Sequence, residues 1–144
     1  MIYNVNTDEI DRRLAFIPLI TEVSLQLEGV KHDEDNAGVY RFAAERAVHL
    51  AAECITDIGN YLIDGFVMRD ASSYEDIVDI LYGEQVFPSE RYTYLQSVVR
   101  LRKPLVQEYD RVDPNELFLV AQHLAKELPL FEQAVRHYLI HNLI

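Results

Sequence analysis

Residues 37–68 read AGVYRFAAERAVHLAAECITDIGNYLIDGFVM, and their pattern is that of a long α-helix. Hydrophobic side chains recur at steps of three and four residues, the spacing that places them on one helical face. Several are small, which permits a neighbouring helix to approach closely. The predicted inner face consists of Ala43, Ala47, Leu50, Ala51, Cys54, Ile58 and Leu62.

The opposite face of this helix is polar. A rotation of about 100° per residue places six polar side chains on one narrow arc. They are Arg46, His49, Glu53, Asp57, Asn60 and Asp64. One interpretation is a solvated face of an amphipathic helix, which the periodicity alone favours. The other is a polar layer between helices or subunits, in which the carboxylates pair with arginines.

The chain before this helix predicts another one. Its apolar stripe, again at steps of three and four, consists of Ile10, Leu14, Ile17, Ile20, Val23 and Leu27. Asn6 and Glu9 resemble a capping box at its start. Pro18 lies inside the stripe, and we expect it to bend the helix rather than end it. Residues 29–36 are then predicted to form a polar loop.

Three further helices are predicted after residue 68. Ser72 and Glu75 form a capping-box pattern that opens a short helix. Pro88 fits the first position of the next helix, which Pro104 is expected to kink. The run 113–116, Asp-Pro-Asn-Glu, supplies the start of the last helix. The inward residues of these helices are Ile77, Ile80, Leu81, Tyr92, Leu95, Val98, Leu105, Tyr109, Leu117, Val120, Leu124, Leu128, Phe131, Val135 and Tyr138.

The predicted fold is therefore all-α. We find no alternating strand pattern and no linker, so residues 1–144 are expected to form one domain. Four long helices and one additional short helix are most simply arranged as an antiparallel four-helix bundle.

Composition narrows the classes of protein. The formal net charge is −11, which disfavours broad nucleic-acid or membrane adhesion driven by charge. The N-terminus lacks the pattern of a signal peptide, and the longest charge-free run, 117–125, is too short to span a bilayer. The single cysteine, Cys54, excludes an intrachain disulfide framework. We expect a cytoplasmic protein without membrane contact.

The spacing of His, Cys, Asp and Glu in the sequence gives little support to a metal site or a nucleophilic cysteine. His49, Glu53 and Asp57 are spaced i, i+4, i+8, but the Glu-x-x-His pattern of di-iron bundles is absent. His137 and His141 lie at the end of the last helix, where a fortuitous pair is the simpler reading. Cys54 lies on the apolar face and reads as a buried structural cysteine. No metal and no cofactor are expected.

One window runs against the acidic character of the chain. Residues 91–111 carry five Lys and Arg against two Asp and Glu. Within it, the helical spacing places Arg102 and Tyr109 nearly on one face, with Gln107 about 140° away from Arg102. An arginine there either forms a structural pair with Glu53 or Asp57, or binds a phosphate or carboxylate ligand. The residue pattern favours the structural pair and leaves the ligand open.

Three segments resemble the HepT-like family, which belongs to the HEPN superfamily (higher eukaryotes and prokaryotes nucleotide-binding). They are Arg46 to Asn60, the Ser73-Tyr74 pair and Arg102-Lys103-Pro104-Leu105-Val106-Gln107-Glu108-Tyr109. The resemblance covers the chain from about residue 10 to residue 138, and its middle is most similar to a bacillus-type cytosolic branch. It implies the HEPN helical fold and a homodimer whose cleft lies near the helix that carries Glu53, Asp57 and Asn60.

The resemblance also implies a site. The family pattern is Arg, four residues, His, any residue, Tyr, in proteins that cut RNA without metal at the dimer cleft. Arg102 matches the arginine, and Tyr109 matches the tyrosine to which a minimal nucleotidyltransferase antitoxin attaches AMP. Gln107 stands at the position of the catalytic histidine. Glutamine cannot act as a general acid or base, so the resemblance implies a weak or inactive nuclease.

Three functions follow as hypotheses. The first is a HepT-like dimer that binds RNA, a nucleotide or a nucleotidyltransferase and has little or no nuclease activity. The second is an active endoribonuclease toxin that uses Arg102, Tyr109 and a carboxylate of the long helix. The third is a purely structural helical dimer. The polar face, with Glu53, Asp57 and Asn60, is the expected support of the site in the first two.

Overall fold

A computed structural model describes residues 2–31, 33 and 36–143, and all regular secondary structure among these residues is helical. The elements are α1 (Thr7–Leu14), α2 (Ile17–Gln26), α3 (Ala37–Gly65), α4 (Tyr74–Gly83), the 3₁₀ turn η1 (Ser89–Arg91), α5 (Tyr92–Gln107) and α6 (Pro114–Asn142). The predicted all-α fold is confirmed for the described residues. Of the expected polar loop, residues 32, 34 and 35 lie outside the described residues.

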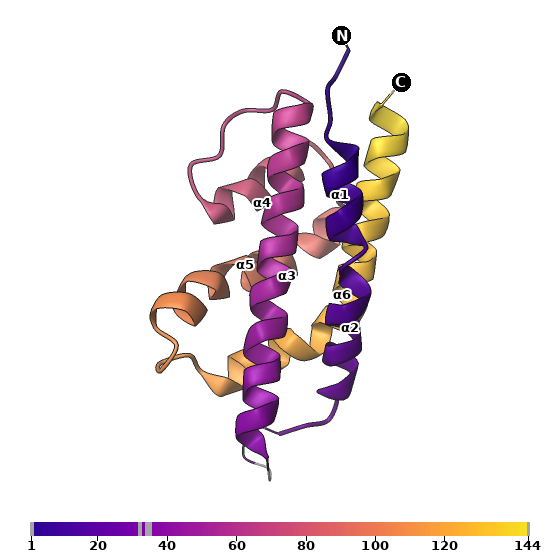
Figure 1. Cartoon of the computed structure of the whole chain (residues 1–144). Helices are drawn as coiled ribbons and strands as arrows, with labels where there is room; N and C mark the ends of the chain where they lie inside the picture. Colours follow the sequence, from indigo (N-terminus) through magenta and orange to yellow (C-terminus); the bar gives the residue numbers. More distant parts are fainter. Residues whose placement is uncertain (1, 32, 34–35, 144) are drawn as a thin grey trace.

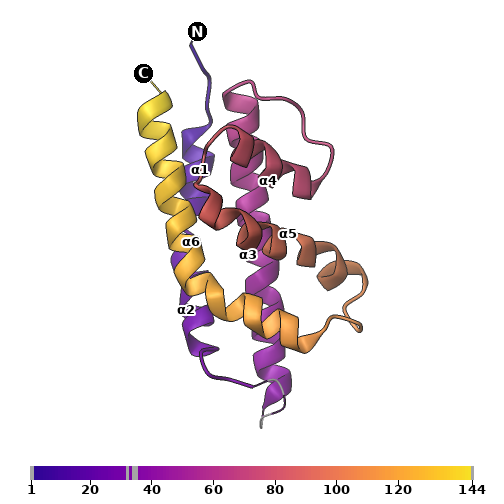
Figure 2. The ribbon, with the colours of Figure 1, turned by 180° about the vertical axis from the view of Figure 1, so that it is seen from behind.

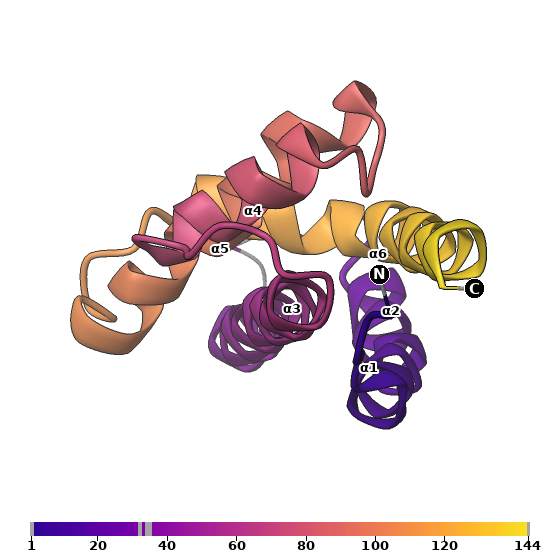
Figure 3. The same cartoon turned by 90° about the horizontal axis from the view of Figure 1, so that it is seen from above.

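The helices pack around a central α3. In Figure 1 the chain descends through α1 and α2, ascends through α3 and ascends again along α6, so that both ends of the chain lie at the same end of the bundle. Figure 3 shows α4 and α5 on the side of α3 and α6 that faces away from α1 and α2. The helix α3 contacts every other α-helix, and this position explains its long row of buried small residues.

The N-terminal helix is interrupted, contrary to expectation. Helix α1 ends at Leu14 and α2 begins at Ile17, so Pro18 belongs to the first turn of a new helix. The physical reason is that proline has no N–H to donate to the carbonyl of residue 14, four positions earlier. The backbone of Ala15 and Phe16 stays in the right-handed helical region. The apolar stripe therefore continues, and Ile10, Leu14, Ile17, Ile20 and Leu27 are all buried.

Two predicted helix starts are displaced. Ser73, not Ser72, caps α4: its side chain accepts a hydrogen bond from the Asp76 backbone N–H at 3.0 Å. Pro88 precedes η1 rather than opening an α-helix, and α5 begins only at Tyr92. At α4 the two adjacent serines have equal capping ability, and Ser73 is the one used. At α5 the turn η1 lies between Pro88 and the first residue of the helix.

Other predicted boundaries are confirmed. Asn6 caps α1 by accepting from the Glu9 backbone N–H, and Asp113 caps α6 with Pro114 at its first turn. The Asp113 carboxylate, however, accepts its hydrogen bond from the Asn115 backbone N–H and not from that of Glu116. Figure 2 shows α6 running obliquely at first and then along α2 and α1. Its inward residues are buried from Leu117 to Val135.

The end of α5 differs from the sequence prediction. The helix continues through Pro104 but stops at Gln107, and the backbone of Glu108 has left the helical region. Tyr109 therefore lies in the connection to α6 and does not face inward as expected; 65% of its surface is exposed. The predicted alignment of Arg102 and Tyr109 on one helical face fails for the same reason.

Candidate functional site

Arg102 lies at the contact between three helices. Its Nε donates a hydrogen bond to Oε1 of Glu53 on α3 at 2.5 Å. Its guanidinium carbon lies 4.0 Å from the ring centroid of Tyr74, the first residue of α4. The side chains of Arg102 and Glu53 keep 26% and 32% of their surface exposed. The arginine is thus held on one edge and on one face, yet remains open to solvent.

The outer edge of the same guanidinium is uncommitted. Neither Nη1 nor Nη2 of Arg102 donates a hydrogen bond to any residue that the structure describes. A guanidinium with both terminal nitrogens available presents a planar fork that matches a phosphate or carboxylate. The arrangement can therefore receive an anionic group.

Two more side chains of α3 continue this cluster. Nε2 of His49 lies 3.5 Å from Oε1 of Glu53, the oxygen that also accepts from Arg102. Nδ1 of His49 lies 3.5 Å from Nη1 of Arg46. Positions 46, 49 and 53 follow one another at steps of three and four, which places them on one face of the helix.

Asp57 belongs to a different cluster. Its Oδ2 lies 3.5 Å from Nε of Arg13 on α1. Arg13 also forms an ion pair with Glu9, one helical turn earlier, and its guanidinium lies 5.2 Å from the centroid of the Tyr61 ring. The hydrogen bond from Arg13 lowers the pKa of the Glu9 carboxyl. These contacts attach α1 to α3 and involve no residue of α5.

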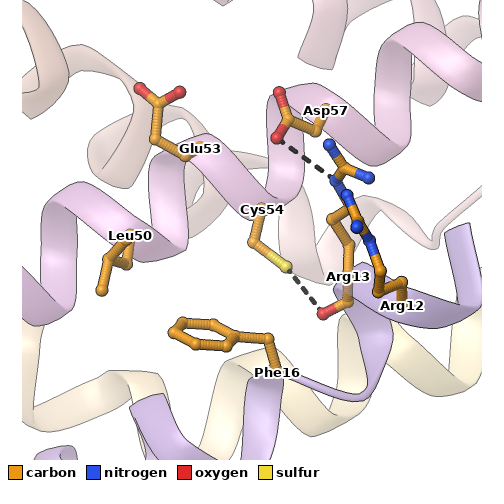
Figure 4. Close-up of a pocket in the computed structure, with 7 residues that line it drawn as sticks. All are labelled: Arg12, Arg13, Phe16, Leu50, Glu53, Cys54 and Asp57. Carbon is orange, nitrogen blue, oxygen red and sulfur yellow. Dashed lines mark hydrogen bonds and ion pairs between the residues drawn. The ribbon is translucent and has the colours of Figure 1, made fainter. Parts of the chain in front are cut away.

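Figure 4 shows a pocket between the α1–α2 junction and α3. Its volume is about 260 Å³, and it is lined by Arg12, Arg13, Phe16, Leu50, Glu53, Cys54 and Asp57. Cys54 points toward α1, and its Sγ donates to the carbonyl oxygen of Arg13 at 3.4 Å. Burial raises the pKa of this thiol to about 12, so Cys54 is neutral and unsuited to act as a nucleophile.

A second groove lies between α3 and α5. It has a volume of about 200 Å³ and is lined by Phe42, Glu45, Arg46, His49 and Leu105. Phe42 is 72% exposed there. Leu105 lies three residues after Arg102, and His49 lies four residues before Glu53. The groove therefore adjoins the Arg102–Glu53 pair.

The two remaining motif residues lie at the end of α5. Gln107 is its last residue and is exposed. The carbonyl oxygen of Tyr109 accepts a hydrogen bond from Nη2 of Arg41 on α3 at 3.3 Å, while its side chain projects into solvent. The connection that carries Tyr109 is thus attached to α3.

Each interpretation of the polar face holds for part of it. Glu53 and Asp57 are half-buried and paired with arginines, whereas Asn60 and Asp64 are exposed. The structure joins Arg102 to Glu53 and assigns Asp57 to Arg13. Among the described residues, no group of three or more His, Cys, Asp or Glu side chains could hold a metal ion.

Two participants were missed from the sequence. Arg13 carries only the signal of an i,i+4 pair with Glu9, typical of many exposed helices. Tyr74 was noted for its resemblance to the family but not as a contact of Arg102. The contacts Arg13–Asp57 and Arg102–Tyr74 join residues that are distant in the chain. A local sequence pattern does not predict such contacts.

This helical bundle with a stacked, carboxylate-held arginine belongs to a known class. Residues 16–138 match the family described as Ribonuclease HepT-like, and the chain is a member of the HepT-like family. It is 36% identical over 138 residues to "Putative RNase YutE" of Bacillus subtilis (strain 168), covering 96% of this chain and 92% of that protein.

Solved structures of similar proteins share the fold of this chain. The structure described as that of the cytosolic protein of unknown function YutE from Bacillus subtilis superposes with a TM-score of 0.83 at 33% identity, over 99% of this chain and 96% of the other. The tRNA nuclease HepT of Aphanizomenon flos-aquae (strain 2012/KM1/D3) is 23% identical over 95% of this chain and 94% of its own length. A toxin–antitoxin complex with AMP-PNP shares the fold, with a TM-score of 0.77 at 16% identity over 90% of this chain and 98% of that one.

The sequence relatives thus include a protein named as a tRNA nuclease, and the toxin–antitoxin structure shares the fold. Within the described part of the chain, none of the helices combines the length and the apolar character that crossing a bilayer requires.

Proposed function

We propose that this protein binds RNA or a nucleotide through Arg102 in a homodimer cleft, and that Gln107 leaves it weak or inactive as a ribonuclease. The observation that supports binding is that the guanidinium of Arg102 is held in place while its terminal nitrogens have no hydrogen-bond partner among the described residues. Glu53 and Tyr74 fix its guanidinium at Nε and at one face, so that the two terminal nitrogens are available to a phosphate. Relationship to a tRNA nuclease makes RNA the first ligand to test.

The local charge supports the same ligand. Arg100, Arg102 and Lys103 lie close together on α5, and Arg46 lies across the groove on α3. The rest of the chain is acidic, with a net charge of −11 overall. These cations therefore form a local site and not a broad basic surface. Such a site suits one or a few phosphates of a single strand.

Binding is tested with the purified protein and fluorescently labelled single-stranded RNA, by anisotropy. Arg102→Ala removes a charge-assisted fork and is expected to weaken binding about tenfold or more. Arg100→Ala removes an equal charge from an exposed position two residues away, about 200° around the helix, and is expected to have a smaller effect. Equal loss in both variants would indicate diffuse attraction and would contradict a site at Arg102. No RNA binding by the unmodified protein would leave the purely structural dimer.

We also propose that a nucleotidyltransferase partner attaches AMP to Tyr109. Its side chain is exposed, so a nucleotidyltransferase could reach its hydroxyl. Incubation with ATP and a minimal nucleotidyltransferase is expected to add the mass of one AMP, and Tyr109→Phe is expected to abolish the addition. An unchanged mass in the unmodified protein would remove this partner.

A further inference from the structure

His49 lies beside the Arg102–Glu53 pair, in a site whose position 107 offers no proton acceptor. Its imidazole shares Oε1 of Glu53 with Arg102, at 3.5 Å from its own Nε2. Gln107, at the position of the family's histidine, cannot exchange a proton. Among the five histidines of the chain, His49 is on α3, while His123, His137 and His141 are on α6 and His32 is outside the described residues.

The contacts of His49 define its tautomer. Glu53 can only accept, so Nε2 carries the proton and donates toward Oε1. Nη1 of Arg46 can only donate, so Nδ1 of the neutral ring is the accepting nitrogen. A carboxylate behind one nitrogen of an imidazole orients the ring and stabilises its protonated form. Nδ1 therefore carries the lone pair that can take a proton, and its long 3.5 Å contact with Arg46 must open for it to do so.

The groove beside His49 presents an aromatic ring and a cation to a ligand. The groove lies between α3 and α5 and has a volume of about 200 Å³. The exposed ring of Phe42 lines it. Aromatic rings stack on unpaired bases of any identity. Arg46 lines the groove and Arg102 adjoins it, so cations for the phosphates are present around His49.

We propose that His49 is the proton acceptor for phosphodiester cleavage in single-stranded RNA, with Arg102 binding the reacting phosphate and Phe42 stacking on a flanking base. This inference rests on the proposed function, because it needs RNA bound at Arg102. It replaces the histidine expected at position 107 with one contributed by a different helix.

The step balances without a metal or a cofactor. The ribose 2′-oxygen attacks phosphorus and gives its proton to Nδ1 of His49. The bond between phosphorus and the 5′-oxygen breaks, and that oxygen keeps the electron pair and takes a proton from water. The products are a 2′,3′-cyclic phosphate and a 5′-hydroxyl. The imidazolium, stabilised by Glu53, then releases its proton to the hydroxide left by that water.

The test compares cleavage and binding in the same preparations. The unmodified protein is expected to cut 5′-labelled single-stranded RNA slowly and to leave cyclic phosphate ends. His49→Gln is expected to lower the rate by about 10²-fold or more while RNA binding stays within twofold. His141→Gln, an exposed histidine at the far end of α6, is the matched control and is expected to cut normally.

A pH profile separates proton transfer from a structural role. The pH dependence of the cleavage rate in the unmodified protein is expected to be lost in His49→Gln, because glutamine exchanges no proton. The charged groups that contact or adjoin His49 are Glu45, Arg46 and Glu53 of α3, and Arg102 of α5. Circular dichroism melts of both histidine variants show whether the fold is retained.

The outcomes distinguish the two proposals. Binding of RNA without cleavage by the unmodified protein overturns the role of His49 and leaves the proposed function intact. Normal cleavage by His49→Gln also overturns it. Absence of both binding and cleavage overturns the proposed function itself. Arg102→Ala, purified in parallel, must lose the cleavage, because a contaminating ribonuclease would persist in that preparation.

Discussion

Arg102 and Glu53 lie 49 residues apart in the chain, and a single hydrogen bond from Nε to Oε1, 2.5 Å long, joins α5 to α3. The terminal nitrogens of Arg102 have no hydrogen-bond partner among the described residues. A bidentate pair would engage at least one of those terminal nitrogens as well. The observed geometry holds the arginine in place and leaves its fork for a ligand.

The ring of Tyr74 is expected to support this arginine. Tyr74→Ala removes the face on which the guanidinium stacks, a contact worth about 0.5–1 kcal/mol at exposed sites. We expect RNA affinity, measured by anisotropy, to fall about two- to fivefold. Tyr74→Phe keeps the ring and is expected to bind like the unmodified protein. An equal loss in both variants would assign the effect to the hydroxyl group instead.

Restoring the histidine of the family pattern is expected to increase RNA cleavage. Gln107→His supplies a group that exchanges protons near neutral pH, for a gain of about 10²–10⁴-fold in rate. Val106→His places the same side chain on the neighbouring exposed position and serves as the control. Gel analysis of labelled RNA measures both rates. A similar gain from Val106→His would show that position 107 has no special relation to Arg102.

Close approach of α3 and α4 at Gly59 is expected to make this position intolerant of a side chain. A Cβ at residue 59 would overlap Cγ2 of the buried Ile77. Overpacking typically costs 1–3 kcal/mol, which exceeds the helix preference of about 1 kcal/mol for alanine over glycine. Gly59→Ala should therefore lower the free energy of unfolding in urea. Gly38→Ala, where a Cβ meets nothing within 4 Å, is expected to be neutral or slightly stabilising.

Acid is expected to weaken the connection between α3 and α4. The two hydrogen bonds from Arg69, each 2.7 Å long, and the Ser72 N–H lower the pKa of Asp76 well below the ordinary 3.8. A depressed pKa in the folded state adds stability above 3.8, and this contribution disappears as the pH falls toward the folded-state pKa. The difference in unfolding free energy between the unmodified protein and Asp76→Asn should therefore shrink as the pH falls. Asp70→Asn, at an exposed neighbouring position, is expected to show no such trend.

The proposed dimer is expected to use the apolar groove between α2 and α3. This groove, about 260 Å³ in volume, is lined mainly by hydrophobic side chains, including the half-exposed Leu19, and it shares Arg46 with the groove at His49. Exposed apolar surface of this kind marks interaction sites. Light scattering is expected to show twice the chain mass of 16.7 kDa. Leu19→Glu should reduce it to that of a monomer, whereas Ile140→Glu, on the exposed end of α6, should not.

Much of the fold was predictable because helix signals are local. The buried stripe of residues 10–27, the long α3 and the Asp113 cap of α6 depend on side chains within one or two turns of each other. Where adjacent residues carry equal signals the prediction failed, as at Ser72 and Ser73. The end of α5 at Gln107 also escaped prediction, and with it the exposed position of Tyr109.

The amino-acid sequence by itself determined that the chain is an all-α, HepT-like protein, and it predicted that Arg102, Gln107 and Tyr109 occupy the positions of the family motif. Only the tertiary structure decided that Arg102 contacts Glu53 and Tyr74, that Asp57 belongs to Arg13, and that His49 adjoins the arginine. Periodicity assigns a residue to a face of its own helix. It does not specify which residue of another helix it will meet, because that depends on how the packed cores set the position and rotation of every helix.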